Sequence, residues 1–215
     1  MTAPAFIFFD LDGVLVDSEP HHDKAERAIY TEVSGGRRTG PGFDTTGTST
    51  RALYATLVRE LGLPHDVDAL NARHYDETFR NIVAAKEPPM PGLLPLLDAL
   101  DLSRIPYAVV SSSYRSYVEN VLRYLEIGGR FRFAVCGDEA ARVKPAPDLY
   151  ERALALTNVS AAHTVAIEDR RAGIDAANAA GIRTIGLDRR VGQDLSAADA
   201  TVSALNGVPR LLGIG

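Results

Sequence analysis

The sequence predicts a doubly wound α/β domain, a parallel sheet covered by helices on both faces, with a small helical lobe inserted into it. Short apolar runs that end in acidic or small residues alternate with helical patterns, as parallel strands buried on both faces require. Between the first two runs, from about Ser18 to Lys86, helical patterns follow one another without a convincing strand. An insertion after the first strand explains both observations.

The expected elements follow from these patterns in chain order. The predicted strands are the five apolar runs at residues 5–10, 106–110, 132–136, 164–167 and 184–187. Core helices are expected at residues 114–125, 148–156 and 172–180, and lobe helices at residues 20–33, 49–61 and 66–85. Glycines at residues 35–42 and Pro64 separate the lobe helices. We therefore assign residues 1–16 and 88–215 to the core and residues 17–87 to the lobe.

Composition excludes several classes of function. The chain has 215 residues, a formal net charge of -5 and no long basic run, which argues against nucleic-acid binding. It has no apolar stretch long enough to span a bilayer and no charged segment typical of a signal peptide, so a cytoplasmic protein is expected. The single cysteine, Cys136, cannot form an intrachain disulfide, and its apolar run predicts a packed core residue.

Polar side chains follow the predicted strands at the points where the strands end. These residues are Asp10, Asp12, Ser111, Glu168 and Asp169, and Lys144 leads from the third strand into a helix. Each one could merely end a strand or cap a helix. The carboxyl ends of parallel strands meet at one edge of a sheet, however, so the set is expected to converge. Gathered acids repel one another without a cation, and carboxylates suit Mg²⁺, whereas no Cys/His pattern suggests zinc.

A phosphate site is expected beside these acids. Ser111, Ser112 and the neighbouring backbone N–H groups open a helix predicted from about Tyr114, and helix starts bind anions. Ser113 is the serine expected to serve as the N-cap of that helix. Lys144 adds a positive charge that can neutralise both a phosphate and a nucleophile.

The motifs carry a resemblance to a known family. The segment Asp10-Leu11-Asp12-Gly13-Val14-Leu15-Val16-Asp17-Ser18-Glu19 resembles the first motif of the haloacid dehalogenase superfamily, in its β-phosphoglucomutase-like branch. Ser111, Lys144 in Lys-Pro-Ala-Pro-Asp, and Glu168-Asp169 match the second, third and fourth motifs in order and spacing. The resemblance covers nearly the whole core, and the inserted lobe is similar to the small cap domain of the family.

This resemblance implies a two-step phosphoryl transfer. Asp10 attacks phosphorus and forms an aspartyl-phosphate, which splits one difficult displacement into two. Asp12 protonates the leaving group and then activates the incoming water or hydroxyl. Mg²⁺ is held by the Asp10 carboxylate, the Asp12 backbone carbonyl and Asp169, with Glu168 bound directly or through water.

Three positions need separate interpretation. Arg170, followed by Arg171, stands where the family often has serine, and an exposed pair without a catalytic role is expected. His22 occupies a position that is often histidine in this branch, which leaves a role near the substrate and a role on the helix surface both open. Arg51 lies near the cap arginine with which sugar-phosphate mutases grip a distal phosphate, but its register is off by about one residue.

The leading hypothesis is a magnesium-dependent phosphatase acting on a small phosphorylated metabolite, of which a sugar phosphate is the expected class. A hexose phosphate mutase is the alternative, since it shares the core chemistry. A dehalogenase is disfavoured because that branch does not keep the second acid, Asp12. A non-enzymatic phospho-receiver module is disfavoured by the inserted lobe and the Asp-x-Asp spacing.

Overall fold

The computed structural model describes residues 3–35, 49–190 and 192–214. The chain forms two compact units, one made of Met1–Asp17 with Pro88–Gly215 and the other of Ser18–Glu87. We refer to them as the core unit and the cap unit and describe each by itself.

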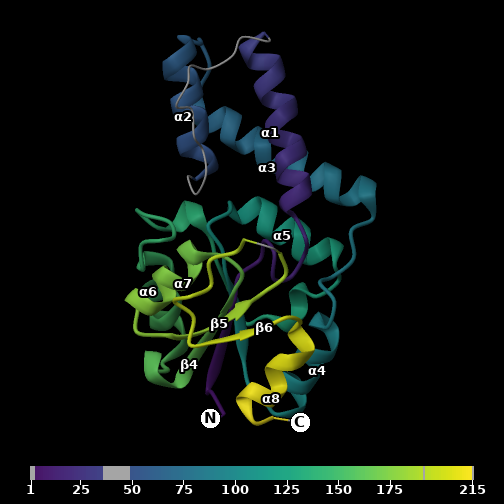
Figure 1. Ribbon diagram of the computed structural model, residues 1–215, viewed down its shortest axis with the longest axis vertical. Coiled ribbons are helices and arrows are strands. Elements are labelled where there is room, and N and C mark those ends of the chain that lie inside the picture. The colour runs from purple at the N-terminus through teal and green to yellow at the C-terminus, as the bar shows by residue number, and fades with distance from the viewer. Residues whose placement is uncertain (1–2, 36–48, 191, 215) are drawn as a thin grey trace. The chain divides into compact units, whose positions relative to one another are not determined.

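The core unit is built on one parallel sheet. Its strands are β1 (Phe6–Phe9), β2 (Tyr107–Val110), β3 (Ala134–Val135), β4 (Thr164–Glu168), β5 (Arg183–Leu187) and β6 (Ala200–Val202). They lie in the order β3-β2-β1-β4-β5-β6, and every neighbouring pair is parallel. The order runs outward in both directions from β1, which confirms the predicted doubly wound α/β fold (Figure 1).

Helices cover both faces of this sheet (Figure 1). On one face, α6 (Asp148–Thr157) and α7 (Arg171–Ala179) pack against Phe6, Phe8 and their neighbours in β2 and β4. On the other side lie α4 (Leu93–Leu102) and α8 (Val208–Leu212), which contact each other. The central strands are buried on both faces as a result, in agreement with their nearly continuous apolar sequence.

The cap unit consists of three helices, α1 (Glu19–Ser34), α2 (Thr50–Leu61) and α3 (Val67–Ala85). Its apolar core is built around Ile29, Tyr54, Leu57 and their neighbours. The side chains of Ser49 and Asp66 accept hydrogen bonds from the first turns of α2 and α3 and so cap them. All three helices agree closely with the predicted ranges. The glycines predicted to break the chain at residues 36–42 lie outside the described residues.

Several core elements differ from the expectation. Strand β3 covers two residues of the predicted five, and β6, α4 and α8 were not predicted. The remaining core helix is α5 (Arg115–Tyr124), and short 3₁₀ turns lie at Gly128–Arg130, Gly137–Glu139, Ala161–His163 and Leu205–Gly207. Within the described ranges, no helix combines the length and the apolar character that crossing a membrane requires.

Candidate active site

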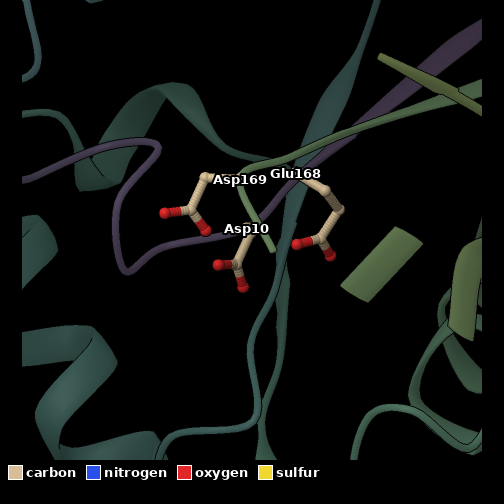
Figure 2. Close-up of side chains that lie close together, drawn as sticks. All are labelled: Asp10, Glu168 and Asp169. Carbon is tan, nitrogen blue, oxygen red and sulfur yellow. The ribbon is translucent and has the colours of Figure 1, made fainter. Parts of the chain in front are cut away.

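Three carboxylates gather at the carboxyl edge of the sheet. Asp10 directly follows β1, Glu168 is the last residue of β4, and Asp169 comes next. Pairing of β1 with β4 makes them neighbours, and the Asp10 N–H donates to the Ile167 carbonyl at 3.0 Å. One carboxylate oxygen from each residue lies within 4.8 Å of the others, and Figure 2 shows the three side chains together. The convergence predicted for these acids is therefore observed.

Lys144 joins this cluster from the loop before α6. Its ammonium group donates to Asp10 Oδ1, Glu168 Oε1 and the Val110 carbonyl, each at 2.7 Å. Its side chain is only 6% exposed, so all three ammonium donors are used inside the protein. The lysine thus links two of the acids and neutralises part of their charge.

Burial and mutual repulsion control the protonation of these groups. Burial, followed by the charge of Asp10, raises the pKa of Glu168 to about 8. Burial also raises the pKa of Asp10, against the attraction of Lys144. For Lys144, burial acts to lower the pKa, but the charges of Asp10 and Glu168 outweigh it and raise the pKa above the ordinary value. The acids therefore keep their protons to a higher pH than isolated carboxyl groups do, because Lys144 alone does not offset the charge that they would carry when all are ionised.

Glu168 is held by two further features of the core. The Tyr150 hydroxyl, from α6, donates to the same oxygen as Lys144 does. At Gly173, in α7, an added Cβ would lie 2.0 Å from Glu168 Oε2, so only glycine leaves room for this carboxylate. Glu168 is consequently fixed at the bottom of the site, with 1% of its side chain exposed.

Asp12 is oriented by two hydroxyl groups. Ser113 Oγ donates to Asp12 Oδ2 at 2.7 Å, and the Tyr117 hydroxyl, from α5, donates to Asp12 Oδ1 at 2.8 Å. The expectation that Ser113 caps α5 was wrong, because its hydroxyl bonds Asp12 and Tyr114 stands at the N-cap position. Asp138 serves the helix instead, since its carboxylate accepts from the Arg115 N–H at 3.0 Å.

The proposed phosphate-binding serines lie between β2 and α5. Ser111 is buried, and its hydroxyl accepts from the Ser113 N–H at 3.1 Å. Ser112 packs against Gly137, where an added Cβ would lie 2.1 Å from the Ser112 carbonyl oxygen. This tight turn places both serines at the same edge of the sheet as Asp10, as the sequence predicted.

Asp169 has a different environment from the other two acids. Arg189 donates to its Oδ2 at 3.2 Å, and Gln193 donates to its backbone carbonyl at 2.7 Å. Its Oδ1 is buried and has no hydrogen-bond partner among the described residues. Burial and then Asp10 raise the pKa of Asp169 to about 6, although Arg170 and Arg189 act to lower it.

These observations fit a bound Mg²⁺. An unpartnered buried carboxylate oxygen is costly unless something binds it, and three close carboxylates need positive charge beyond that of Lys144. The donors are all oxygens, which Mg²⁺ prefers. The residues present are thus able to hold the predicted ion.

Other residues singled out in the sequence lie as expected. Arg170 and Arg171 are exposed, and Arg171 pairs with Asp175 and Asp194, each at 2.7 Å. Cys136 is fully buried, and burial raises the pKa of its thiol to about 12, which excludes a reactive thiolate.

His22 and Arg51 belong to the cap unit. His22 Nδ1 lies 2.8 Å from His74 Nε2 with the rings stacked, and the Tyr54 hydroxyl lies 3.0 Å from His74 Nδ1. Arg51 forms a two-point ion pair with Asp68, at 2.6 and 3.3 Å, on the exposed surface of the unit. Contact of either residue with a substrate stays a prediction.

Sequence reasoning missed four side chains that support the site: Tyr117, Tyr150, Arg189 and Gln193. The two tyrosines are ordinary helix residues in sequence, and nothing local distinguishes them. Arg189 did carry a usable signal, because it follows Asp188 at the end of the fifth predicted strand and hence lies at the same edge of the sheet.

Comparison with known proteins identifies the family of this chain. A family model described as haloacid dehalogenase-like hydrolase matches residues 7–187. Validoxylamine A 7'-phosphate phosphatase of Streptomyces hygroscopicus subsp. limoneus is 32% identical over 186 residues, 83% of each chain. A phosphorylated carbohydrates phosphatase of Thermotoga maritima is 29% identical over 83% of this chain and 82% of its own length.

Solved structures show the same fold. The crystal structure of CbbY from Rhodobacter sphaeroides in complex with phosphate superposes with a TM-score of 0.82, covering 95% of this chain and 96% of that one at 22% identity. A putative β-phosphoglucomutase from Thermotoga maritima gives a TM-score of 0.74 at 26% identity, with 99% of both chains covered. The match of the family model over most of the chain shows that this protein belongs to the haloacid dehalogenase-like hydrolases.

Proposed function

We propose that this hydrolase is a magnesium-dependent phosphatase that acts on a small phosphorylated metabolite through an aspartyl-phosphate on Asp10, with a sugar phosphate as the expected substrate class. The observation that carries the proposal is the contact of Lys144 with Asp10 inside a cluster of three carboxylates. A carboxylate nucleophile can approach an anionic phosphate only where such positive charge offsets the repulsion. The phosphatases among its relatives support the reaction class.

Asp10 and Asp169, together with the Asp12 backbone carbonyl, would hold the Mg²⁺, and Glu168 would bind it directly or through water. The bound ion supplies charge neutralisation for the phosphate and for the nucleophile. Lys144 adds a fixed positive charge, because its ammonium is buried in contact with both Asp10 and Glu168.

In the first step an Asp10 carboxylate oxygen forms a bond to phosphorus as the bond from phosphorus to the ester oxygen breaks. Asp12 gives its proton to the departing alcohol. Backbone N–H groups and hydroxyls of Ser111 and Ser112 hold the phosphate oxygens, as a turn that leads into a helix allows. Positioning of this kind, together with charge neutralisation, supplies most of the catalysis in phosphoryl transfer.

In the second step a water oxygen attacks phosphorus, Asp12 takes the proton of that water, and the bond from phosphorus to Asp10 breaks. The products are inorganic phosphate and the regenerated carboxylate. Ser113 and Tyr117 orient Asp12 for this step, because each donates a hydrogen bond to one of its carboxylate oxygens.

Hydrolysis is favoured over transfer to a second hydroxyl of a sugar by the position of Arg51 in the sequence. A mutase of this branch grips a distal phosphate with a cap arginine, and the register of Arg51 is off from that position by about one residue. The pair of Arg51 with Asp68 is exposed and weak, so it does not by itself separate the two assignments.

A panel of sugar, polyol and nucleotide phosphates tests the proposal by release of inorganic phosphate, with Mg²⁺ and with EDTA. We expect release from at least one class of sugar phosphate that depends on Mg²⁺. Asp10→Asn is expected to lose about 10⁴-fold or more of the rate, since removal of a nucleophile has effects of this order. Isomerisation that outpaces phosphate release would replace the phosphatase by the mutase, and full activity of Asp10→Asn would exclude both.

A further inference from the structure

Arg189 is a buried cation that the family motifs do not include. It lies in the loop after β5, and its guanidinium is placed between two acids of the core unit. One nitrogen, Nη2, donates to Asp169 Oδ2 at 3.2 Å, and Nη1 lies 3.4 Å from Asp17 Oδ1. Only 10% of the Arg189 side chain and 3% of the Asp169 side chain are exposed, so the pair that they form is not a surface ion pair.

The loop that carries Arg189 is itself fixed to Asp169. Gln193 Oε1 accepts hydrogen bonds from the N–H groups of Arg189 and Arg190, at 2.8 and 2.7 Å, while Gln193 Nε2 donates to the Asp169 carbonyl at 2.7 Å. A single side-chain amide therefore sets the distance between the arginine backbone and the acid backbone.

Gly13 closes the opposite side of the pair. A Cβ at this position would lie 2.0 Å from Asp169 Oδ2 and 2.7 Å from Arg189 Nη2. The chain thus packs tightly around the hydrogen bond between the two side chains, and neither can rotate freely.

The result is an asymmetric Asp169 carboxylate. Oδ2 is occupied by Arg189, whereas Oδ1 is buried and, among the residues that the structure describes, has no partner. Outer groups that bond to a metal-binding carboxylate fix its orientation and leave the other oxygen for the ion. The Arg189 contact thereby selects which oxygen of Asp169 is open to a cation.

We infer that Arg189 is a positioning residue of the magnesium site, which holds the Asp169 carboxylate so that Oδ1 is presented to the ion. The inference rests on the proposed function, because it assumes that Mg²⁺ binds at Asp169. Electrostatic repulsion alone would predict that Arg189 weakens Mg²⁺ binding, since a guanidinium repels a divalent cation. Asp17 reduces that repulsion only in part, because its Oδ1 lies 3.4 Å from Arg189 Nη1 and also accepts a hydrogen bond from Arg190 Nη2.

Titration of Mg²⁺ into the metal-free full chain, followed by calorimetry without any substrate, tests the inference. Arg189→Gln is expected to bind Mg²⁺ about 10–100-fold more weakly than wild type, the usual effect of losing such an outer contact. Arg189→Lys, which keeps a cation near Asp169, is expected to recover part of the affinity. Arg171→Gln is the matched control, because it removes the same charge from an exposed residue that pairs with Asp175 and Asp194, and its affinity is expected to equal that of wild type.

Unchanged or tighter binding by Arg189→Gln, with wild type binding normally, overturns the inference and leaves the proposed function intact. Failure of wild type to bind Mg²⁺ overturns the metal site and the inference together. Thermal melts without metal establish whether each variant is folded. Should Arg189→Gln not fold, Asp17→Asn releases the other end of the Arg189 guanidinium together with that of Arg190, which shares Asp17 Oδ1. Arg190→Gln, which breaks only the second of these contacts, is its control. Asp17→Asn is expected to weaken Mg²⁺ binding by a smaller factor than Arg189→Gln would, and binding equal to that of Arg190→Gln overturns the inference.

Discussion

The two units of this protein bury polar side chains for different purposes. In the core unit, Asp10, Lys144 and Glu168 come from three separate segments and bond to one another at the edge of the sheet. Such a cluster costs stability, because burial raises the pKa of both acids. Buried charge that is retained at this cost indicates a chemical function.

In the cap unit, polar side chains contact one another between the helices of the unit itself. Tyr54, His74 and His22 form a chain of contacts from α2 through α3 to α1. Its arginines Arg51 and Arg73 form ion pairs at the exposed surface, with Asp68 and Glu32. The comparison indicates that the core unit is organised for chemistry and that the described polar contacts of the cap unit serve its own fold.

The largest expected effect of a single substitution at a position other than Asp10 is that of Lys144→Met. It leaves Asp10 and Glu168 buried without their shared cation, and breaking a buried ion pair on one side costs about 3–5 kcal/mol. Urea unfolding at pH 8 should show this loss together with loss of activity. Lys24→Met, on the exposed surface of α1, is the control and should change the free energy of unfolding by about 0.5 kcal/mol or less. Equal losses of unfolding free energy in Lys144→Met and Lys24→Met would contradict the view that the core unit contains a buried charge cluster that depends on Lys144.

The pH dependence of stability should show the cost of the acid cluster directly. The pKa of Glu168 is raised from 4.5 to about 8 and that of Asp169 from 3.8 to about 6. Between pH 4 and pH 8 the metal-free folded chain therefore holds protons that the unfolded chain has released, so stability falls as pH rises through this window.

Added Mg²⁺ should reverse that loss, because it replaces the protons on these carboxylates. The increase in melting temperature on adding Mg²⁺ is consequently expected to be larger at pH 8 than at pH 5, with EDTA as the reference. An increase that is equal at both pH values would show that the acid cluster is not where the ion binds.

Tyr117→Phe is expected to have an intermediate effect. It removes one of the two hydroxyls that orient Asp12, and a hydrogen bond to a charged group contributes about 1.5–3 kcal/mol, or roughly 10–100-fold in kcat. KM should change little, since the hydroxyl acts on Asp12 and not on the substrate. Tyr124→Phe, at the end of the same helix, is the control. A change confined to KM would assign Tyr117 to substrate binding instead.

Arg51→Gln is expected to have the smallest effect. Its exposed pair with Asp68 should contribute too little to shift the melting temperature measurably. Release of phosphate from a monophosphate should keep its kcat and KM. A large loss of activity restricted to bisphosphate substrates would instead make Arg51 a phosphate-binding residue and revive the mutase alternative.

Sequence patterns predicted the fold where burial is uniform. Strands β1, β2 and β4 are buried throughout, and β5 is buried after Arg183; each contains an apolar run, so their ends could be placed to within about one residue. Strand β6 could not be recognised, because its three residues are only partly buried and form no apolar run. Helix α4 was missed although its buried leucines, at residues 93, 96, 97 and 100, follow the helical spacing, because Pro95 lies within it, near its start.

The part of the candidate site that could be predicted from the sequence consists of residues at the ends of strands. Asp10, Glu168 and Asp169 follow strands that are neighbours in the sheet, so topology alone brings them together. The end of β5 also places Arg189 at this edge, but the contacts of Arg189 and Gln193 with Asp169 could not be predicted, since they depend on how one loop folds back onto Asp169. The side chains that determine substrate specificity stay unassigned, because their contacts also depend on tertiary structure and not on the ends of strands.

The most direct test of the account is to trap the phosphoryl group during turnover. Wild-type enzyme is mixed with its best substrate from the panel and Mg²⁺, quenched in acid within the first turnover and digested for peptide mass spectrometry. The account predicts a phosphoryl group on Asp10 that hydroxylamine removes, and none in Asp10→Asn. A phosphoryl group on another side chain, such as Ser111, or phosphate release while Asp10 stays unmodified throughout the turnover would contradict it.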